Sequence, residues 1–141
     1  MPVNPTVRKI FSRSHVFWYR VSGGVLGGSM RGAPIVLLTT TGRSSGQTRT
    51  TPLQSIADGE HTVVVASNGG HKVHPQWWLN LKANPEATVQ VRRRQLKMRA
   101  EEATGPERER LWLKAVNQYP GYVNYQKTAE REIPVVVLKP V

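Results

Sequence analysis

Apolar and polar residues follow one another in short runs along most of the chain, and many of these runs are rich in β-branched residues. Such runs, bounded by Gly, Pro, Asn and Asp, are typical of short strands joined in hairpins. They predict six strands, at residues 35–41, 49–57, 62–67, 87–92, 95–102 and 133–138. Asp58-Gly59 predicts a hairpin turn between the second and third strands, so the first three form an antiparallel meander.

The first 30 residues have a character of their own. Apolar residues at helical spacing over residues 7–21, with arginines and a lysine largely off that stripe, predict a basic amphipathic helix. Two glycine pairs after it predict a flexible connector. Tryptophan and phenylalanine on the stripe favour packing on the protein's own core. Contact with an anionic membrane surface is the alternative that the sequence leaves open.

Two further helices are predicted in the rest of the chain. A short helix begins at Pro75 and ends before Pro85. A longer helix covers residues 106–118, and Thr104 with Glu107 predicts a capping box at its start. Pro120 and Gly121 break this helix. The turn that follows brings three tyrosines close together: Tyr119, Tyr122 and Tyr125.

The order of elements is one helix, three strands, a helix, two strands, a helix and a final strand. Hairpins without regular alternation of strand and helix favour a small β-barrel over a doubly wound sheet. We therefore expect a mainly β fold with peripheral helices and about six mostly antiparallel strands. The length of 141 residues, without a break in composition, predicts one domain over residues 1–141, with residues 1–30 as its N-terminal helix and connector.

The chain has a formal net charge of +11, from 20 basic and 9 acidic residues. This charge favours an anionic partner: nucleic acid, a membrane surface or an acidic small molecule. Cysteine is absent, which excludes disulfides, thiolate metal sites and cysteine nucleophiles. His71 and His74 are three residues apart, but no carboxylate or third histidine lies near them in sequence, so no metal site is expected.

No apolar segment approaches the roughly 18 residues of a membrane span, and the N-terminus lacks an apolar signal core. We therefore expect a cytoplasmic protein, and membrane association through residues 7–21 stays open.

The segment between the first two predicted strands is rich in Gly, Ser, Thr and Arg. Small residues let backbone N–H groups approach a ligand, and Arg43 and Arg49 offer forked donors suited to phosphate or carboxylate. Residues 42–46 also fit the G-x-S-x-G nucleophile elbow. An elbow needs a helix directly after the serine, whereas residues 48–53 are β-branched and contain Pro52. An anion cradle is the preferred interpretation, and a plain hairpin loop is the alternative.

Several motifs occur together in order and spacing: Leu37-Leu38-Thr39-Thr40-Thr41-Gly42-Arg43 with a following Ser-Gly-Gln, Val64-Val65-Ala66-Ser67 with Gly69-Gly70, Pro75 with Trp77 and Asn80-Leu81, Ala83-Asn84-Pro85, and Tyr119-Pro120-Gly121-Tyr122. Over residues 32–140 the chain resembles the deazaflavin-dependent nitroreductases, which are oxidoreductases that use coenzyme F420. The N-terminal helix is similar to the leading helix of their quinone-reducing branch.

The resemblance implies a split β-barrel like those of flavin-binding reductases. It also implies binding of reduced F420 and transfer of a hydride to an electron-poor small molecule, such as a quinone, an enone or a nitro compound. F420 carries a phosphate and an oligoglutamate tail, which suits a basic protein with an anion cradle. The expected partner is thus a small-molecule acceptor rather than nucleic acid. Hydride transfer from a bound cofactor needs positioning more than an acid/base pair.

The family's site residues map onto this chain in three groups. The cofactor phosphate and tail would contact Arg43, Ser44, Ser45 and Arg49. The deazaflavin ring would be bordered or covered by Pro52, Leu53, Gln54, Val65, Ala66, Ser67, Asn68, Gln76, Trp77, Trp78 and Asn80. The substrate would lie near Tyr119, Tyr122 and Tyr125, and the catalytic candidates that orient the acceptor and assist its protonation are Ser67 and Tyr122.

Three positions depart from the family pattern. Ser44 stands where many relatives have a cation, Asn68 where a lysine is common, and Gln54 where an aromatic residue is common. Two other functions stay open: an FMN-binding split barrel, and a basic nucleic-acid-binding barrel that uses a surface including Arg92, Arg94, Lys97 and Arg99. Pairing into a homodimer across the open side of the barrel is also left open.

Overall fold

The computed structural model describes residues 29–30 and 33–141. The helix predicted over residues 7–21 lies outside the described residues. The strands are β1 (Ser29–Met30), β2 (Ala33–Thr41), β3 (Thr48–Gln54), β4 (Ile56–Asp58), β5 (His61–Val65), β6 (Glu86–Val91), β7 (Arg94–Glu102) and β8 (Val135–Pro140). The helices are the 3-10 helix η1 (Asn68–Gly70) and the α-helices α2 (Gln76–Ala83), α3 (Gly105–Gln118) and α4 (Gly121–Ala129).

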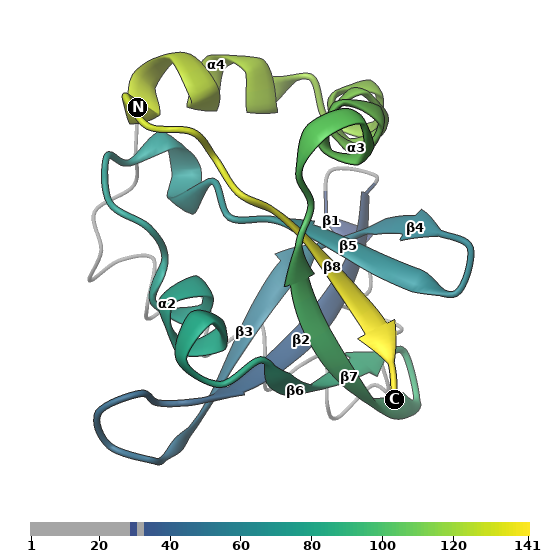
Figure 1. Ribbon diagram of the computed structural model, residues 1–141. Helices are drawn as coiled ribbons and strands as arrows, with labels where there is room; N and C mark the ends of the chain where they lie inside the picture. Colours follow the sequence, from purple (N-terminus) through teal and green to yellow (C-terminus); the bar gives the residue numbers. More distant parts are fainter. Residues whose placement is uncertain (1–28, 31–32) are drawn as a thin grey trace.

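One continuous length of chain closes the sheet into a barrel. β2 pairs with β3 on one side and with β6 on the other, and the sheet continues through β7, β8, β5 and β4 (Figure 1). β3 and β4 are separated by Ser55 alone. The chain therefore pairs first with β2 and then, beyond Ser55, with β5. All of these pairs are antiparallel.

The split-barrel fold class is confirmed, and the strand count differs from six in two places. The single strand predicted at residues 49–57 is broken at Ser55, because that buried residue directs its N–H to the carbonyl of Pro34, 2.9 Å away. The two-residue strand β1 was not predicted. The hairpin turn after β4 is one residue later than expected, at Gly59-Glu60, because Asp58 still pairs with His61.

Burial divides into an inner and an outer cluster that share two strands. Along β5, Val64 belongs to the inner cluster with α2, while Val63 and Val65 belong to the outer cluster with α3 and α4. Successive strand residues point to opposite faces, so β5 is buried on both sides, as is β8. This explains why the sequence shows unbroken valine runs there instead of apolar–polar alternation.

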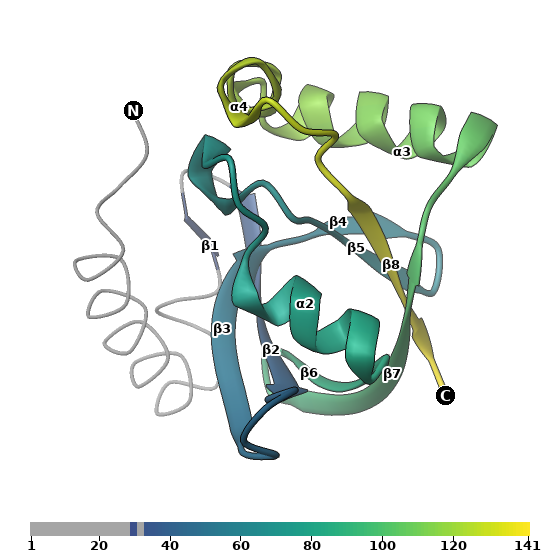
Figure 2. The same ribbon diagram turned by 60° about the vertical axis from the view of Figure 1, so that its left-hand side comes forward.

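The helix α2 lies against the barrel, where it packs on β2 (Figure 2). It begins after Pro75 and ends at Asn84, as predicted. Trp77 and Trp78 are 6% and 5% exposed and both belong to the inner cluster. The structure thus places these two side chains in the barrel core.

The region around α3 and α4 differs from prediction in two respects. The capping box is wrong, because the Thr104 side chain makes no cap hydrogen bond; its carbonyl accepts the N–H of Arg108 instead, at 3.3 Å. The segment from Tyr119 was predicted as a turn, yet Gly121–Ala129 forms α4. Pro120 ends α3 since it has no N–H, but its φ of −59° suits the entry to the next helix.

An ion-pair cluster ties the β4–β5 hairpin to α3. Asp58 Oδ1 lies 2.9 Å from Arg110 Nη1 and 3.0 Å from Lys114 Nζ, and Oδ2 lies 2.9 Å from Arg110 Nη2. The bonds from Arg110 and then Lys114 hold the pKa of the Asp58 carboxyl well below its usual range. The two cations are about half exposed, so solvent screens much of the attraction.

We predict that Asp58→Asn lowers the free energy of unfolding by about 1 kcal/mol at neutral pH. The folded-state pKa of Asp58 is depressed, so this stabilisation is present above its unfolded pKa of roughly 4 and is lost as pH falls through the folded-state pKa. Urea denaturation of the unaltered protein and the variant, at neutral pH and at a pH below the unfolded pKa of Asp58, measures the difference in their free energies of unfolding. Glu86→Gln, an exposed charge removal on β6, is the control. A difference that stayed constant into acid would contradict the assignment.

Candidate functional site

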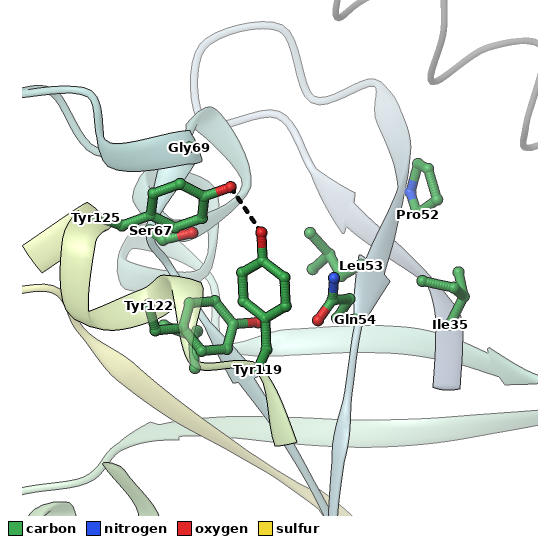
Figure 3. Close-up of a pocket in the computed structure, with 10 residues that line it drawn as sticks. Ile35, Pro52, Leu53, Gln54, Ser67, Gly69, Tyr119, Tyr122 and Tyr125 are labelled. Carbon is green, nitrogen blue, oxygen red and sulfur yellow. Dashed lines mark hydrogen bonds between the residues drawn. The ribbon is translucent and has the colours of Figure 1, made fainter. Parts of the chain in front are cut away.

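A cavity of about 260 Å³ opens between the end of β3 and the helices α3 and α4 (Figure 3). Its lining comes from four separate stretches of the chain: Ile35, Pro52, Leu53, Gln54, Val65, Ser67, Gly69, Tyr119, Tyr122 and Tyr125. Eight of these ten residues belong to the set predicted from sequence. Ile35 and Gly69 do not.

One wall of the cavity is mainly apolar. Pro52, Leu53 and Gln54 are the last three residues of β3, and Ile35 on β2 pairs directly with Gln54. Val65 ends β5. Proline within a central strand would remove a ladder hydrogen bond. Among the described strands β3 pairs with β2 alone, so Pro52 is tolerated there. This wall offers apolar side chains beside one amide side chain.

The opposite wall is a cluster of three tyrosines. Tyr119 follows α3, and Tyr122 and Tyr125 are three residues apart on α4, so they share one face of that helix. The Tyr119 and Tyr125 hydroxyls are 3.1 Å apart and hydrogen bonded, and the Tyr119 and Tyr122 rings meet edge to face with centroids 5.0 Å apart. A Cβ on Gly121 would come within 2.6 Å of the Tyr119 ring, so this packing requires glycine there.

Tyr122 is the most buried of the three, at 5% exposed. Burial, and then the neighbouring tyrosines, raise the pKa of its hydroxyl well above the usual value. The phenol therefore stays neutral at physiological pH and acts as a hydrogen-bond donor rather than as a proton source.

Two further residues of the cavity lining carry a polar side-chain group without a partner among the described residues. Ser67, 8% exposed, makes no side-chain hydrogen bond to another described residue. The Oε1 atom of Gln54 is buried and has no hydrogen-bond partner among the described residues. An unpaired buried acceptor costs about 1–3 kcal/mol, and native proteins contain few of them. Both groups are therefore available to a ligand.

The loop between β2 and β3 is closed by its own hydrogen bonds. The N–H of Gly42 donates to Gln47, that of Gly46 to Gly42, and that of Gln47 to Ser45 Oγ. The N–H of Arg43 donates to Asn80 Oδ1 at 3.1 Å. The predicted cradle of free backbone N–H groups is therefore wrong for these four residues, because the tight loop consumes the donors that its small residues were expected to expose.

The two arginines of this loop lie in different surroundings. Arg43 donates from Nη1 to Asn80 Oδ1 at 2.9 Å and from Nη2 to Gln76 Oε1 at 2.8 Å, so its guanidinium holds the loop to α2. Arg49 is exposed and makes no side-chain bond to another described residue, and Ser44 is exposed beside the loop tip. Arg49 is four residues from Leu53 along β3, or roughly 13 Å of strand. A ligand that contacts both must carry an extended anionic tail.

The remaining predicted residues do not line the cavity. Ala66, Trp77 and Trp78 belong to the inner core cluster. Asn68 has a positive φ of 50° and donates its side chain to the carbonyl of Val73. Gln76 and Asn80 are bound to Arg43.

Arg131 organises the segment after β5, and no sequence pattern predicted it. Its guanidinium donates to the carbonyl oxygens of Ala66, Ser67 and His71 at 3.1–3.3 Å, and lies 3.1 Å from His74 Nδ1. Since a guanidinium cannot accept, Nδ1 of His74 must be the acceptor. Burial, and then the charge of Arg131, lower the pKa of His74. In the sequence Arg131 lies between two glutamates, in a charged stretch that gives no indication of a structural role.

Within the described part of the chain, no group of three or more His, Asp or Glu side chains is arranged to hold a metal ion. Among the same residues, no helix is long and apolar enough to cross a membrane.

Known structures first give the class of protein. A FAD-binding protein from Mesorhizobium loti, 14% identical, shares the fold alone, with a TM-score of 0.50 over 75% of this chain and 78% of that one. The fold is thus that of the flavin-reductase-like split barrels. The chain belongs to the F420H(2)-dependent quinone reductase family, whose model matches residues 11–140. The cofactor of that family is reduced coenzyme F420.

Individual relatives agree with this family. An F420H(2)-dependent quinone reductase of Mycobacterium tuberculosis (strain H37Rv) is 40% identical over 89% of this chain and 87% of its own length. A solved F420-H2 dependent reductase (FDR-A) is 44% identical, with a TM-score of 0.70, over 75% of this chain and 94% of that one. A structure described as a domain-swapped dimer is 39% identical, with a TM-score of 0.73, over 90% and 96%.

We predict that Arg131→Lys loosens the segment from Ser67 to His71. A single ammonium cannot reach three carbonyl oxygens in the planar geometry of a guanidinium. Hydrogen exchange at the N–H groups of Gly70 and His71, which bond to Ser67 and Asn68, should accelerate about tenfold or more. Arg99→Lys on β7 is the matched control and should change nothing. Unaltered exchange at Gly70 in Arg131→Lys would mean that the contacts of Arg131 do not hold this segment.

Proposed function

We propose that the protein reduces a quinone-like acceptor with reduced F420, in the cavity between the end of β3 and the tyrosine cluster. One observation carries the proposal: apolar side chains and phenols line the same cavity at the end of β3, and an exposed arginine, Arg49, lies near the start of that strand. This arrangement fits a planar ring with an anionic tail. When bound, reduced F420 supplies the hydride.

The residues divide the work of binding between them. Pro52 and Leu53 would border the cofactor ring, with Val65 beneath it, and Gln54 would lie beyond the ring, on the acceptor side of the cavity. Arg49, Ser44 and Ser45 would contact the phosphate and tail, while Arg43 would shape the loop through α2. Charged and polar contacts at the tail add affinity, and the apolar wall keeps water from the ring.

Ser67 and Tyr122 would orient the acceptor. A quinone becomes a hydroquinone by gaining one hydride and one proton, and negative charge develops on its oxygen before the proton arrives. A neutral phenol donates a hydrogen bond to such an oxygen and lowers the energy of that charge. The raised pKa of Tyr122 keeps it in the donating form. The proton itself would come from water, through the hydroxyls that line the cavity.

A homodimer belongs to the same proposal. The support is the 39% identical relative described as a domain-swapped dimer. Contact of residues 7–21 with a membrane and localisation in the cytoplasm stay predictions.

A titration of the purified protein with F420, with FMN and with a single-stranded DNA oligonucleotide tests the proposal against its two alternatives. The fluorescence of each ligand reports its binding. We expect binding to F420 alone at moderate salt, with Kd in the micromolar range or tighter. Arg49→Ala should raise the F420 Kd at least about tenfold, roughly 1.4 kcal/mol, because it removes an exposed guanidinium that makes no side-chain bond to another described residue.

Arg93→Ala, in the turn between β6 and β7, removes the same charge elsewhere and should leave the F420 Kd unchanged. Equal weakening by the two variants would reduce the role of Arg49 to net charge, and absence of F420 binding by the unaltered protein would refute the proposed function.

Tyr122→Phe should lower kcat about tenfold and leave F420 affinity unchanged, because it removes one hydrogen bond to the developing charge. Since burial raises the pKa of Tyr122, the kcat profile should show no loss from tyrosine ionisation up to about pH 10. Tyr125→Phe, which removes a hydroxyl already bonded to Tyr119, is the comparison and should cost less. A kcat of Tyr122→Phe within twofold of the unaltered enzyme would show that the Tyr122 hydroxyl does not stabilise the developing charge.

A further inference from the structure

The Gln54 side chain places an unpaired hydrogen-bond acceptor inside the cavity. Gln54 is the last residue of β3 and lines the cavity, and its Oε1 is buried without a partner among the described residues. In native proteins nearly all buried polar groups have a hydrogen-bond partner. An exception inside a ligand cavity points to a group that the ligand supplies.

The hydroxyls around Gln54 leave this acceptor unsatisfied. Those of Tyr119 and Tyr125 bond to each other at 3.1 Å, and neither Ser67 nor Tyr122 donates to Gln54. Figure 3 shows the Gln54 side chain extending from β3 toward Tyr119. An amide oxygen can accept but not donate. The missing partner is therefore a donor, an O–H or an N–H, carried by whatever fills the space between β3 and the tyrosines.

The position of Gln54 along β3 assigns that donor to the acceptor molecule. From the loop inward, β3 presents Arg49, then the apolar Pro52 and Leu53, and last Gln54, which shares the cavity with the tyrosines. On the proposed function, the tail of the cofactor contacts Arg49 and its ring contacts Pro52 and Leu53. Gln54 then contacts the molecule that receives the hydride.

A plain quinone cannot satisfy this acceptor, because its carbonyl oxygens only accept hydrogen bonds. We propose that the physiological acceptor is a quinone that carries a neutral hydroxyl substituent, and that Gln54 selects it by accepting a hydrogen bond from that hydroxyl. This inference rests on the proposed function and adds the class of substrate to it. A site with a buried polar group discriminates strongly against an analogue that lacks the matching group.

The test compares two probes that differ in one hydroxyl: a methyl-substituted naphthoquinone and its hydroxymethyl analogue. With the unaltered enzyme and saturating reduced F420, we expect kcat/KM for the hydroxymethyl compound to be at least about tenfold higher, equivalent to roughly 1.4 kcal/mol. In Gln54→Met, which keeps the length of the side chain and removes the acceptor, the ratio should fall to about one. Gln95→Met, on an exposed position of β7, is the matched control and should keep the original ratio.

Two more measurements fix the interpretation. The F420 Kd should be the same within about twofold in all three proteins, and the Tm of Gln54→Met should be no lower than that of the unaltered protein, since the variant removes an unpaired buried acceptor. Gln54→Glu retains an acceptor and should retain the preference for the hydroxymethyl compound.

The possible failures are distinguishable. Loss of F420 binding by the unaltered protein would sink the proposed function itself. Intact F420 binding with equal rates for the two probes would overturn only the selection by Gln54. If Gln54→Met lost kcat/KM equally for the two probes, the Gln54 amide would contact a quinone oxygen that both probes carry. If Gln54→Met raised the F420 Kd tenfold, the amide would contact the cofactor. Either result would overturn the inference.

Discussion

The site depends on the way in which one strand changes partners. Residues 48–58 pair first with β2 and then with β5, and the buried Ser55 marks the change through its bond to Pro34. The change of partner closes the barrel, and it also leaves Pro52, Leu53 and Gln54 at the end of a ladder instead of in its middle. Residues at such an end can face a cavity. The same residues in an unbroken strand would have continued the barrel wall.

The opposite wall is fixed to the barrel by strands that are buried on both faces. Val64 packs inward, while Val63 and Val65 pack against the cluster that contains α3 and α4. Tyr122 belongs to that outer cluster and to the cavity lining at once. Packed interiors resist deformation, so the distance between the apolar wall and the phenols is set by the core. Hydride transfer needs such fixed spacing between two planar molecules.

The arginines of this basic protein make different kinds of contact. Arg43 and Arg49 both flank the loop of the predicted cradle, yet Arg43 is bonded to α2 and Arg49 is exposed. Arg131 binds three backbone carbonyl oxygens beside the cavity. A net charge of +11 predicts an anionic partner, but it does not tell which cations are available to that partner.

The sequence by itself determined most strands and the short helix after Pro75, because short β-branched runs and local turn chemistry are properties of neighbouring residues. The family came from the resemblance of several motifs in order and spacing. The sequence also placed eight of the ten cavity residues in the predicted set. Only the tertiary structure decided the break at Ser55, the helix after Pro120, the closed loop at Arg43, the role of Arg131 and the unpaired oxygen of Gln54. These depend on partners far away in the chain, 37 residues for Arg43 with Asn80 and 65 for Arg131 with Ala66. Local periodicity encodes which face of an element is buried, but not which distant group completes its hydrogen bonds.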